Sequence, residues 1–318
     1  MLLKQVIEAF ELIDDPKASG EGVANKFRKI DSQVEIEVEE VKGEKGSTDF
    51  IKLLIPGLSG CSRGGGAPTL GIVGRLGGLG ARPEMIGAVS DADGAIVAIA
   101  AGLKLVDMHK KGDMLEGDVI IATHVCPSAP TAPHAPAPFM GSPVDMETMN
   151  RLEVDERMEA ILSVDSTKGN EVINHNGIAI SPTVKEGYIL RISPDLLRIL
   201  RIVTGLAPVV FPITSQDITP YGNGLYHLNS ILQPSTATAA PVVGVATTSE
   251  QIVPGSGTGV NSPLSLELAS RFCLEVAKEF GRGSCEFYDA EEFQRILALY
   301  GSMMRLQTAG ASKPVEKT

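Results

Sequence analysis

The sequence predicts an α/β protein of three layers, in which a mixed, mostly parallel central sheet has helices on both faces. Segments with helical spacing of apolar residues alternate with short apolar segments along most of the chain. Strands that are separated by helices form parallel or mixed sheets. The segments 118–124 and 160–165 are short and continuously apolar, which is typical of strands in the centre of a parallel sheet. We expect both to lie near the strand that carries Ile72.

The other elements follow in order, without an internal repeat or a clear linker. The N-terminal segment mixes charged and apolar residues as an amphipathic helix does. Further strands are predicted at 34–41, 50–56, 70–75, 209–214 and 240–247. Further helices are predicted at 94–111, 195–204, 221–232, 263–280 and 290–300. We therefore expect one domain over 1–318, with a loose tail from about residue 307.

Composition limits the classes of function. The chain has 318 residues, 43% of them hydrophobic and 21% charged, which is ordinary for a soluble protein. A net charge of −11 and the lack of Trp argue against nucleic-acid or anionic-membrane partners. The four cysteines form no C-x-x-C pair, and the N-terminal helix does not resemble a signal peptide. We expect a cytoplasmic homo-oligomer whose partner is a small-molecule or short-peptide substrate.

The most informative segment is 89–105, in which Asp91, Asp93 and Gly94 directly precede an Ala-rich helical run. Carboxylates at the start of a helix are stabilised by its free N–H groups and its dipole. Helix capping is the commoner reason for such a pair. A divalent metal or a polarised substrate is the other reason, and the downstream sequence favours it.

Polar side chains follow several predicted strands, at the end where open α/β sheets bind ligands. His124 and Cys126 end one strand, and Asp165 ends the next. Glu250 follows the strand at 240–247, and Asp91 opens its helix in the matching position. His124 alone would more often be structural, but its position near Cys126 and Asp165 makes a site residue equally plausible.

Other candidates stand in loops. His134 lies within the Pro-rich segment 129–138, which could hold one imidazole over a cleft, and Asn223 and His227 lie in a polar stretch before a predicted helix. Gly64-Gly-Gly66 with Arg63 and Arg75 could bind an anion, but the phosphate-loop and dinucleotide-binding patterns are missing. The G-x-S-x-G and H-E-x-x-H patterns are also missing, which disfavours serine hydrolases and helix-borne zinc proteases.

Five motifs together resemble the bacterial family called domain of unknown function 1177, over nearly the whole chain. The family name implies no activity. The motifs are Ser90-Asp-Ala-Asp-Gly-Ala, Thr123-His-Val-Cys-Pro, Asp165-Ser-Thr-Lys-Gly-Asn, Gln216-Asp-Ile-Thr-Pro-Tyr-Gly-Asn-Gly and Val253-Pro-Gly-Ser-Gly-Thr-Gly.

The order of elements is also similar to that of the co-catalytic zinc aminopeptidases. This resemblance implies a zinc-exopeptidase-like fold, with Asp91 as the bridging ligand and Asp165 as a later ligand. The sequence departs from that pattern at three places: the early strand has Arg75 but no His, Thr123-His124 replaces a Glu-Glu pair, and Ser249-Glu-Gln251 lacks the late His. An ordinary dinuclear zinc site is therefore not expected.

We expect a metal-dependent hydrolase of an amide bond in a small peptide-like or amino-acid-derived molecule. Asp91, His124 and Asp165 would hold a divalent metal, with zinc as the candidate and Cys126 or Glu250 as a further ligand. His134 or Glu250 would be the base. Substrate-binding roles are assigned to Arg75, Lys168, Asn170, Asn223 and His227. The alternative is a metal-free relative that binds a small ligand or acts as an assembly partner.

Overall fold

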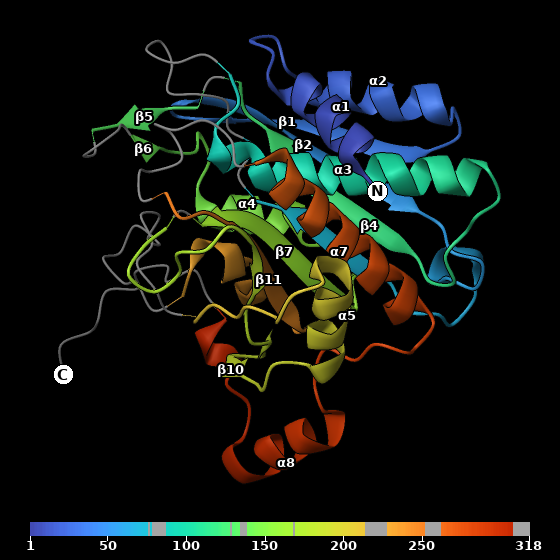
Figure 1. Cartoon of the computed structure of the whole chain (residues 1–318), viewed down its shortest axis with the longest axis vertical. Helices are drawn as coiled ribbons and strands as arrows, with labels where there is room; N and C mark the ends of the chain where they lie inside the picture. Colours follow the sequence, from blue (N-terminus) through green and yellow to red (C-terminus); the bar gives the residue numbers. More distant parts are fainter. Residues whose placement is uncertain are drawn as a thin grey trace.

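The structure is a computed structural model that describes most of the chain. The described residues are 1–75, 77, 87–127, 129–133, 139–167, 169–213, 228–251 and 262–307. They form a mixed α/β arrangement in which helices flank a central sheet of nine strands (Figure 1). Among the described helices, none combines the length and the apolar character that a membrane crossing requires.

Four neighbouring parallel strands form the centre of the sheet. The strand order is β1-β2-β4-β3-β7-β11-β9-β10, and β8 pairs with β11 outside this path. The strands β4, β3, β7 and β11 run parallel, whereas β1, β2, β8, β9 and β10 pair in an antiparallel manner. Their bounds are Glu35–Gly43 (β1), Gly46–Ile55 (β2), Leu70–Gly74 (β3), Val119–Val125 (β4), Ala160–Thr167 (β7), Gly177–Ile180 (β8), Val184–Lys185 (β9), Tyr188–Ile189 (β10) and Val242–Thr248 (β11). A separate pair consists of Thr131–Ala132 (β5) and Phe139–Met140 (β6).

The helices are distributed unequally over the two faces of the sheet. One face is covered by α3 and α7, on which α1, α2 and α5 pack, and the other face is covered by α4 and the 3-10 helix η3. Helix α8 lies at the lower end of Figure 1. The helical bounds are Leu3–Ile13 (α1), Gly20–Ile30 (α2), Asp93–Lys110 (α3), Met146–Glu153 (α4), Pro194–Thr204 (α5), Pro263–Gly281 (α7) and Ala290–Tyr300 (α8). The 3-10 helices are Cys61–Arg63 (η1), Ser90–Ala92 (η2), Ser230–Thr236 (η3) and Met304–Leu306 (η4).

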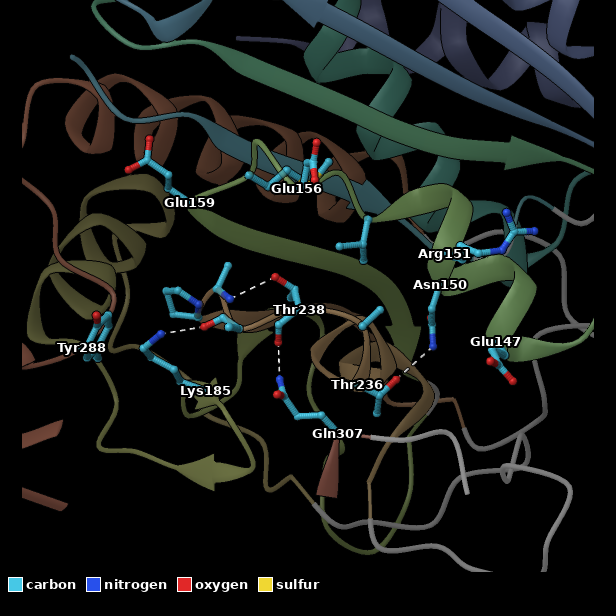
Figure 2. A pocket seen from close by; sticks show the side chains of 16 residues that line it. Glu147, Asn150, Arg151, Glu156, Glu159, Lys185, Thr236, Thr238, Tyr288 and Gln307 are labelled. Carbon is cyan, nitrogen blue, oxygen red and sulfur yellow. Dashed lines mark hydrogen bonds between the residues drawn. The ribbon is translucent and has the colours of Figure 1, made fainter. Parts of the chain in front are cut away.

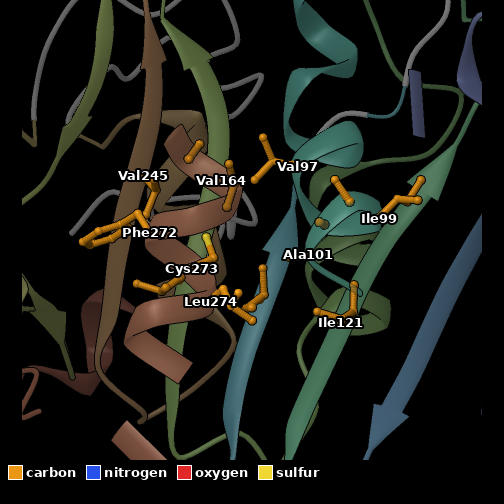
Figure 3. Close-up of a cluster of buried hydrophobic side chains, with 14 of the residues drawn as sticks. Val97, Ile99, Ala101, Ile121, Val164, Val245, Phe272, Cys273 and Leu274 are labelled. Atoms are coloured by element: carbon orange, nitrogen blue, oxygen red, sulfur yellow. The ribbon is translucent and has the colours of Figure 1, made fainter. Parts of the chain in front are cut away.

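The main core lies between the sheet and the pair α3 and α7 (Figure 3). Alternate residues of β4 belong to different cores, because Ile121 packs under α3 whereas Ile120 and Ala122 face α4 and η3. A strand with an apolar core on each face must be apolar throughout, which explains the continuous run in its sequence. Helix α3 is likewise buried around most of its circumference.

The prediction for the centre of the sheet is confirmed. Ile72 of β3 pairs with Ile121 of β4 on one side and with Leu162 of β7 on the other. Helices at α3, α5, α7 and α8 also match their predicted ranges within a few residues. Two other predictions were wrong in part: Val210 makes only an isolated bridge instead of a strand, and the described end of the helix predicted at 221–232 is the 3-10 helix η3.

Candidate functional site

Three of the predicted site residues, Arg75, His124 and Asp165, lie where the central parallel strands end. This carboxyl edge of the sheet also receives the first turn of α3. At Gly94 an added Cβ atom would lie 2.3 Å from the carbonyl oxygen of Val164 and 2.5 Å from that of Arg75. Only glycine therefore lets the start of α3 approach the ends of β3 and β7 this closely. The glycine of the Asp91-Ala-Asp-Gly94 motif thus has a packing reason, which places its two aspartates at this edge.

His124, Arg75 and Asp165 form one row across three adjacent strands. Gly74 of β3 is in register with Thr123 of β4 and with Val164 of β7, so the next residue of each strand continues the row. Side chains alternate between the faces of a sheet, and the residues two places before these three belong to the α4 and η3 side. The row therefore faces α4 and η3, with Arg75 between the imidazole and the carboxylate.

Glu153 at the end of α4 binds two members of this row. Its Oε2 forms an ion pair with Nη1 of Arg75, and its Oε1 lies 2.7 Å from Nδ1 of His124. Arg75 Nη1 also donates to Oδ1 of Asn150 at 3.1 Å. Arg75 and Glu153 are fully buried and His124 is 2% exposed, so each charge depends on its protein partners rather than on water.

The tautomer of His124 follows from its second nitrogen. The backbone N–H of Gly77 donates to Nε2 at 3.4 Å, so Nε2 is an acceptor. Nδ1 is therefore the nitrogen that donates to Glu153. A metal ion bound to His124 would have to replace one of these two hydrogen bonds.

Two buried aspartates lie near the middle of the edge and accept hydrogen bonds from hydroxyl groups. Oδ1 of Asp165 accepts from the N–H of Ser166 at 2.7 Å, and its Oδ2 accepts from Oγ of Ser230 at 3.4 Å. Oγ1 of Thr247 lies 3.1 Å from Oδ2 of Asp93 and 3.4 Å from the backbone oxygen of Asp165. This hydroxyl on β11 therefore links the start of α3 to the end of β7, and both aspartates also make further interactions.

The remaining predicted residues have different surroundings. Asp91 lies in η2, partly exposed, and the N-cap of α3 is Ala92 rather than either aspartate. Oδ1 of Asn170 accepts from the N–H groups of Val172 and Ile173, which stabilises a local turn. Glu250 is exposed directly after β11. The predictions for His134, Lys168, Asn223 and His227 lie outside the described residues.

Sequence reasoning missed Glu153 and Asn150, two of the three residues of α4 that bind Arg75; the third is Met146. Helix α4 has only eight residues, so its apolar spacing gives little signal. A capping pattern does precede it, because Oδ1 of Asp145 accepts from the N–H of Thr148 at 2.7 Å. This backbone hydrogen bond lowers the pKa of Asp145. The cap could have indicated the helix, but not that a glutamate at its end is buried.

The donor set limits which metal the edge could hold. Within the described part of the chain, no three His, Cys, Asp or Glu side chains lie close enough together to share a metal ion. The side-chain oxygens at this edge form two separate pairs, Ser230 with the carboxylate of Asp165 and Thr247 with the carboxylate of Asp93, and Thr247 meets Asp165 only at its backbone oxygen. Zinc is usually held by three or four N, S or O ligands. The described residues therefore do not fit a zinc site, and a carboxylate that keeps water ligands would suit a hard divalent cation better.

Comparison with known proteins identifies the family. The sequence profile described as protein of unknown function (DUF1177) matches residues 39–310. The chain belongs to this family. The match confirms the resemblance drawn from the five motifs, all of which lie within these residues. A search of curated proteins gives no match.

Proposed function

We propose that this DUF1177 protein hydrolyses an amide bond in a small peptide-like or amino-acid-derived molecule, at the carboxyl edge of its sheet. The observation that carries the proposal is the presence of two buried carboxylates at this edge: Asp93, which meets the hydroxyl of Thr247, and Asp165, which meets the hydroxyl of Ser230. Buried titratable groups of this kind are often found at functional sites.

The order of elements also supports the proposal. β3 is followed by Asp91 and α3, β4 ends near His124, β7 ends near Asp165, and the long helix α7 comes after β11. This is the order on which the resemblance to the co-catalytic zinc aminopeptidases rests. A zinc-exopeptidase-like fold is therefore part of the proposal.

A divalent cation would be held by Asp165, with Asp91, which is partly exposed in η2, as the candidate second ligand. It would supply Lewis-acid polarisation of the substrate carbonyl and a more acidic bound water. Glu250 is the candidate general base, because it is exposed at the end of β11 and can reach a molecule at the edge. Asn170, at the turn that follows β7, is the candidate for binding the substrate's polar groups.

The structure suggests a revised role for Arg75 and His124. Both contact Glu153 in a fully buried cluster, so neither side chain presents its polar atoms to solvent. In this proposal they are positioning residues that fix the ends of β3 and β4 against α4. The polar groups that contact substrate would then come from the loops around Asp165 and Glu250.

A second candidate function is supported by the same cluster. Both ring nitrogens of His124 are hydrogen-bonded, so neither is available to a metal or to a proton transfer. A protein that only binds a small ligand requires neither role of a histidine. The candidate is a metal-free relative that binds a small polar molecule at the carboxyl edge. Metal content and turnover distinguish the two functions.

The test compares the wild-type protein with Asp165→Asn and with the control Asp107→Asn, which changes an exposed-face ion pair on α3. Each protein is titrated calorimetrically with Mg²⁺, Mn²⁺ and Zn²⁺ and assayed with free dipeptides and N-acyl amino acids. We expect metal binding and hydrolysis in the wild type and the control. Asp165→Asn should weaken both by at least about tenfold, which corresponds to 1.4 kcal/mol. Ligand binding without metal or turnover would favour the second function, and normal turnover in Asp165→Asn would exclude this site.

A further inference from the structure

A groove of about 990 Å³ lies beside α4 and the end of η3 (Figure 2). It is also lined by Lys185 of β9 and by Tyr288. Glu159 and Pro241, which line it, directly precede β7 and β11, so the groove lies at the amino ends of these strands. Its volume is in the range of natural small-molecule sites.

The backbone segment 235–239, called here the floor of the groove, is held in place by two side chains. Nε2 of Gln307 donates to the carbonyl oxygens of Ser235 and Thr238, at 3.0 Å for Ser235. Nζ of Lys185 donates to the carbonyl oxygen of Ala239 at 2.6 Å. Because these side chains fix the backbone of the floor before any ligand arrives, the groove is preorganised, which lowers the cost of binding.

The charged side chains of the groove differ in how well they are already paired. Lys185 is satisfied, since it contacts Glu186 at 3.0 Å in addition to the backbone of the floor. Arg151 and Glu156 are exposed, and neither has an ion pair or hydrogen bond with another described residue. Glu159 accepts only the N–H of Thr69, at 3.1 Å.

The carboxylates and the arginine of the groove stand on different segments. Figure 2 shows Glu156 and Glu159 on the segment that enters β7, whereas Arg151 projects from α4, which also carries Glu147. Val154, Met158 and Pro241 are apolar residues of the lining. A ligand that bridges the two regions therefore needs a cation for the carboxylates, an anion for Arg151 and a short apolar connection.

We propose that this groove binds a zwitterionic peptide-like molecule, with its cationic group at Glu156 and Glu159 and its carboxylate at Arg151. A free peptide with a basic side chain has this chemistry. The inference does not depend on the proposed hydrolase, because Asp93, Asp165 and Thr247 do not line the groove.

The test measures binding of the tripeptide Ala-Arg-Ala to the full chain by isothermal titration calorimetry. Two matched probes remove one charge each: the C-terminal amide of the same peptide, and Ala-norleucine-Ala. We expect saturable binding of Ala-Arg-Ala with a dissociation constant below about 1 mM, and at least about tenfold weaker binding of each matched probe.

Three variants locate the site. Arg151→Gln should weaken Ala-Arg-Ala by at least about tenfold and should abolish the difference between the peptide and its amide. Glu156→Gln combined with Glu159→Gln should abolish the preference for arginine over norleucine. Arg201→Gln, a change of an exposed arginine on α5, is the matched control and should bind as the wild type does. These side chains are exposed, so the variants should fold, which thermal unfolding checks.

Several outcomes would overturn the proposal. They are the absence of saturable binding, equal binding of all three probes, or unchanged binding in Arg151→Gln and in the double glutamate variant. Asp165→Asn separates this proposal from the hydrolase, because it should leave Ala-Arg-Ala binding at the groove intact while it affects metal binding and turnover. Loss of peptide binding in Asp165→Asn would place the peptide at the carboxyl edge and would also refute the groove.

Discussion

The buried cluster around Glu153 predicts a large effect for the substitution Glu153→Gln. The change keeps the size of the side chain but removes the negative charge beside Arg75, whose guanidinium is fully buried. His124 can still donate from Nδ1 to the amide oxygen of glutamine. The guanidinium then faces an amide N–H₂ group instead of a carboxylate, so two donors meet where an ion pair stood.

Glu153→Gln should lower the free energy of unfolding by about 3–5 kcal/mol, because the loss of one partner of a buried ion pair leaves an uncompensated charge. The entropy of unfolding is about 2.1 cal/mol/K per residue, or about 0.7 kcal/mol/K for 318 residues. The melting temperature should therefore fall by about 4–7 °C. Differential scanning calorimetry measures the temperature, and urea unfolding measures the free energy.

The control is Glu156→Gln, three residues later in the chain, where the carboxylate is exposed. It should change the free energy of unfolding by no more than about 0.5 kcal/mol. The double variant Arg75→Met, Glu153→Gln removes both charges and should be more stable than the sum of the single effects by at least about 1 kcal/mol. A cost below about 1 kcal/mol for Glu153→Gln, or additivity in the double variant, would show that Arg75 does not depend on Glu153.

Three further predictions concern other parts of the molecule. Gly94→Ala should prevent α3 from approaching β3 and β7 and greatly lower the yield of folded protein, whereas Gly66→Ala, with open space at its Cβ position, should change the stability by less than about 0.5 kcal/mol. Hydrogen bonds from Arg157 lower the pKa of Asp155, so its contribution of about 1.5–3 kcal/mol at pH 7 should be lost as the pH falls below about 4. Urea unfolding of Asp155→Asn and wild type should therefore converge at acid pH, and a constant difference would contradict this. Burial raises the pKa of Cys273 to about 12, whereas Cys61 is exposed, so a thiol reagent at pH 8 should modify Cys61 rapidly and Cys273 only after unfolding.

The centre of the sheet could be predicted because its sequence signal is local. The segments that became β4 and β7 begin with the nearly continuous apolar runs 119–122 and 160–164, since each strand faces one core under α3 and α7 and another under α4 and η3. The same holds for the end of α3, where Gly112 follows the basic last turn with a φ of +82°. These patterns are formed by residues that are adjacent in the sequence, so they can be recognised without knowing which distant residues they contact.

The parts that the sequence could not predict depend on contacts between distant segments. Glu153 resembles any glutamate at the end of a short helix, and only the fold places it between Arg75 and His124. The end of the helix predicted at 221–232 is a 3-10 helix that runs on to Thr236, and Pro234 within it has no N–H group to donate to an α-helical hydrogen bond. The row of His124, Arg75 and Asp165 required the register of three strands that are separated by long segments of chain.

Helix α4 connects the two proposed sites, and this affects how variants should be interpreted. Oδ1 of Asn150 accepts from Arg75 near the carboxyl edge, and its Nδ2 donates to Thr236 in the groove at 3.3 Å. A change that shifts α4, such as Glu153→Gln, can therefore alter both sites without touching either ligand. Lost activity in that variant would not make Glu153 catalytic. Asp165 does not line the groove, and Arg151 makes no hydrogen bond or ion pair with the other described residues, so Asp165→Asn and Arg151→Gln are the substitutions that can assign a function to one site.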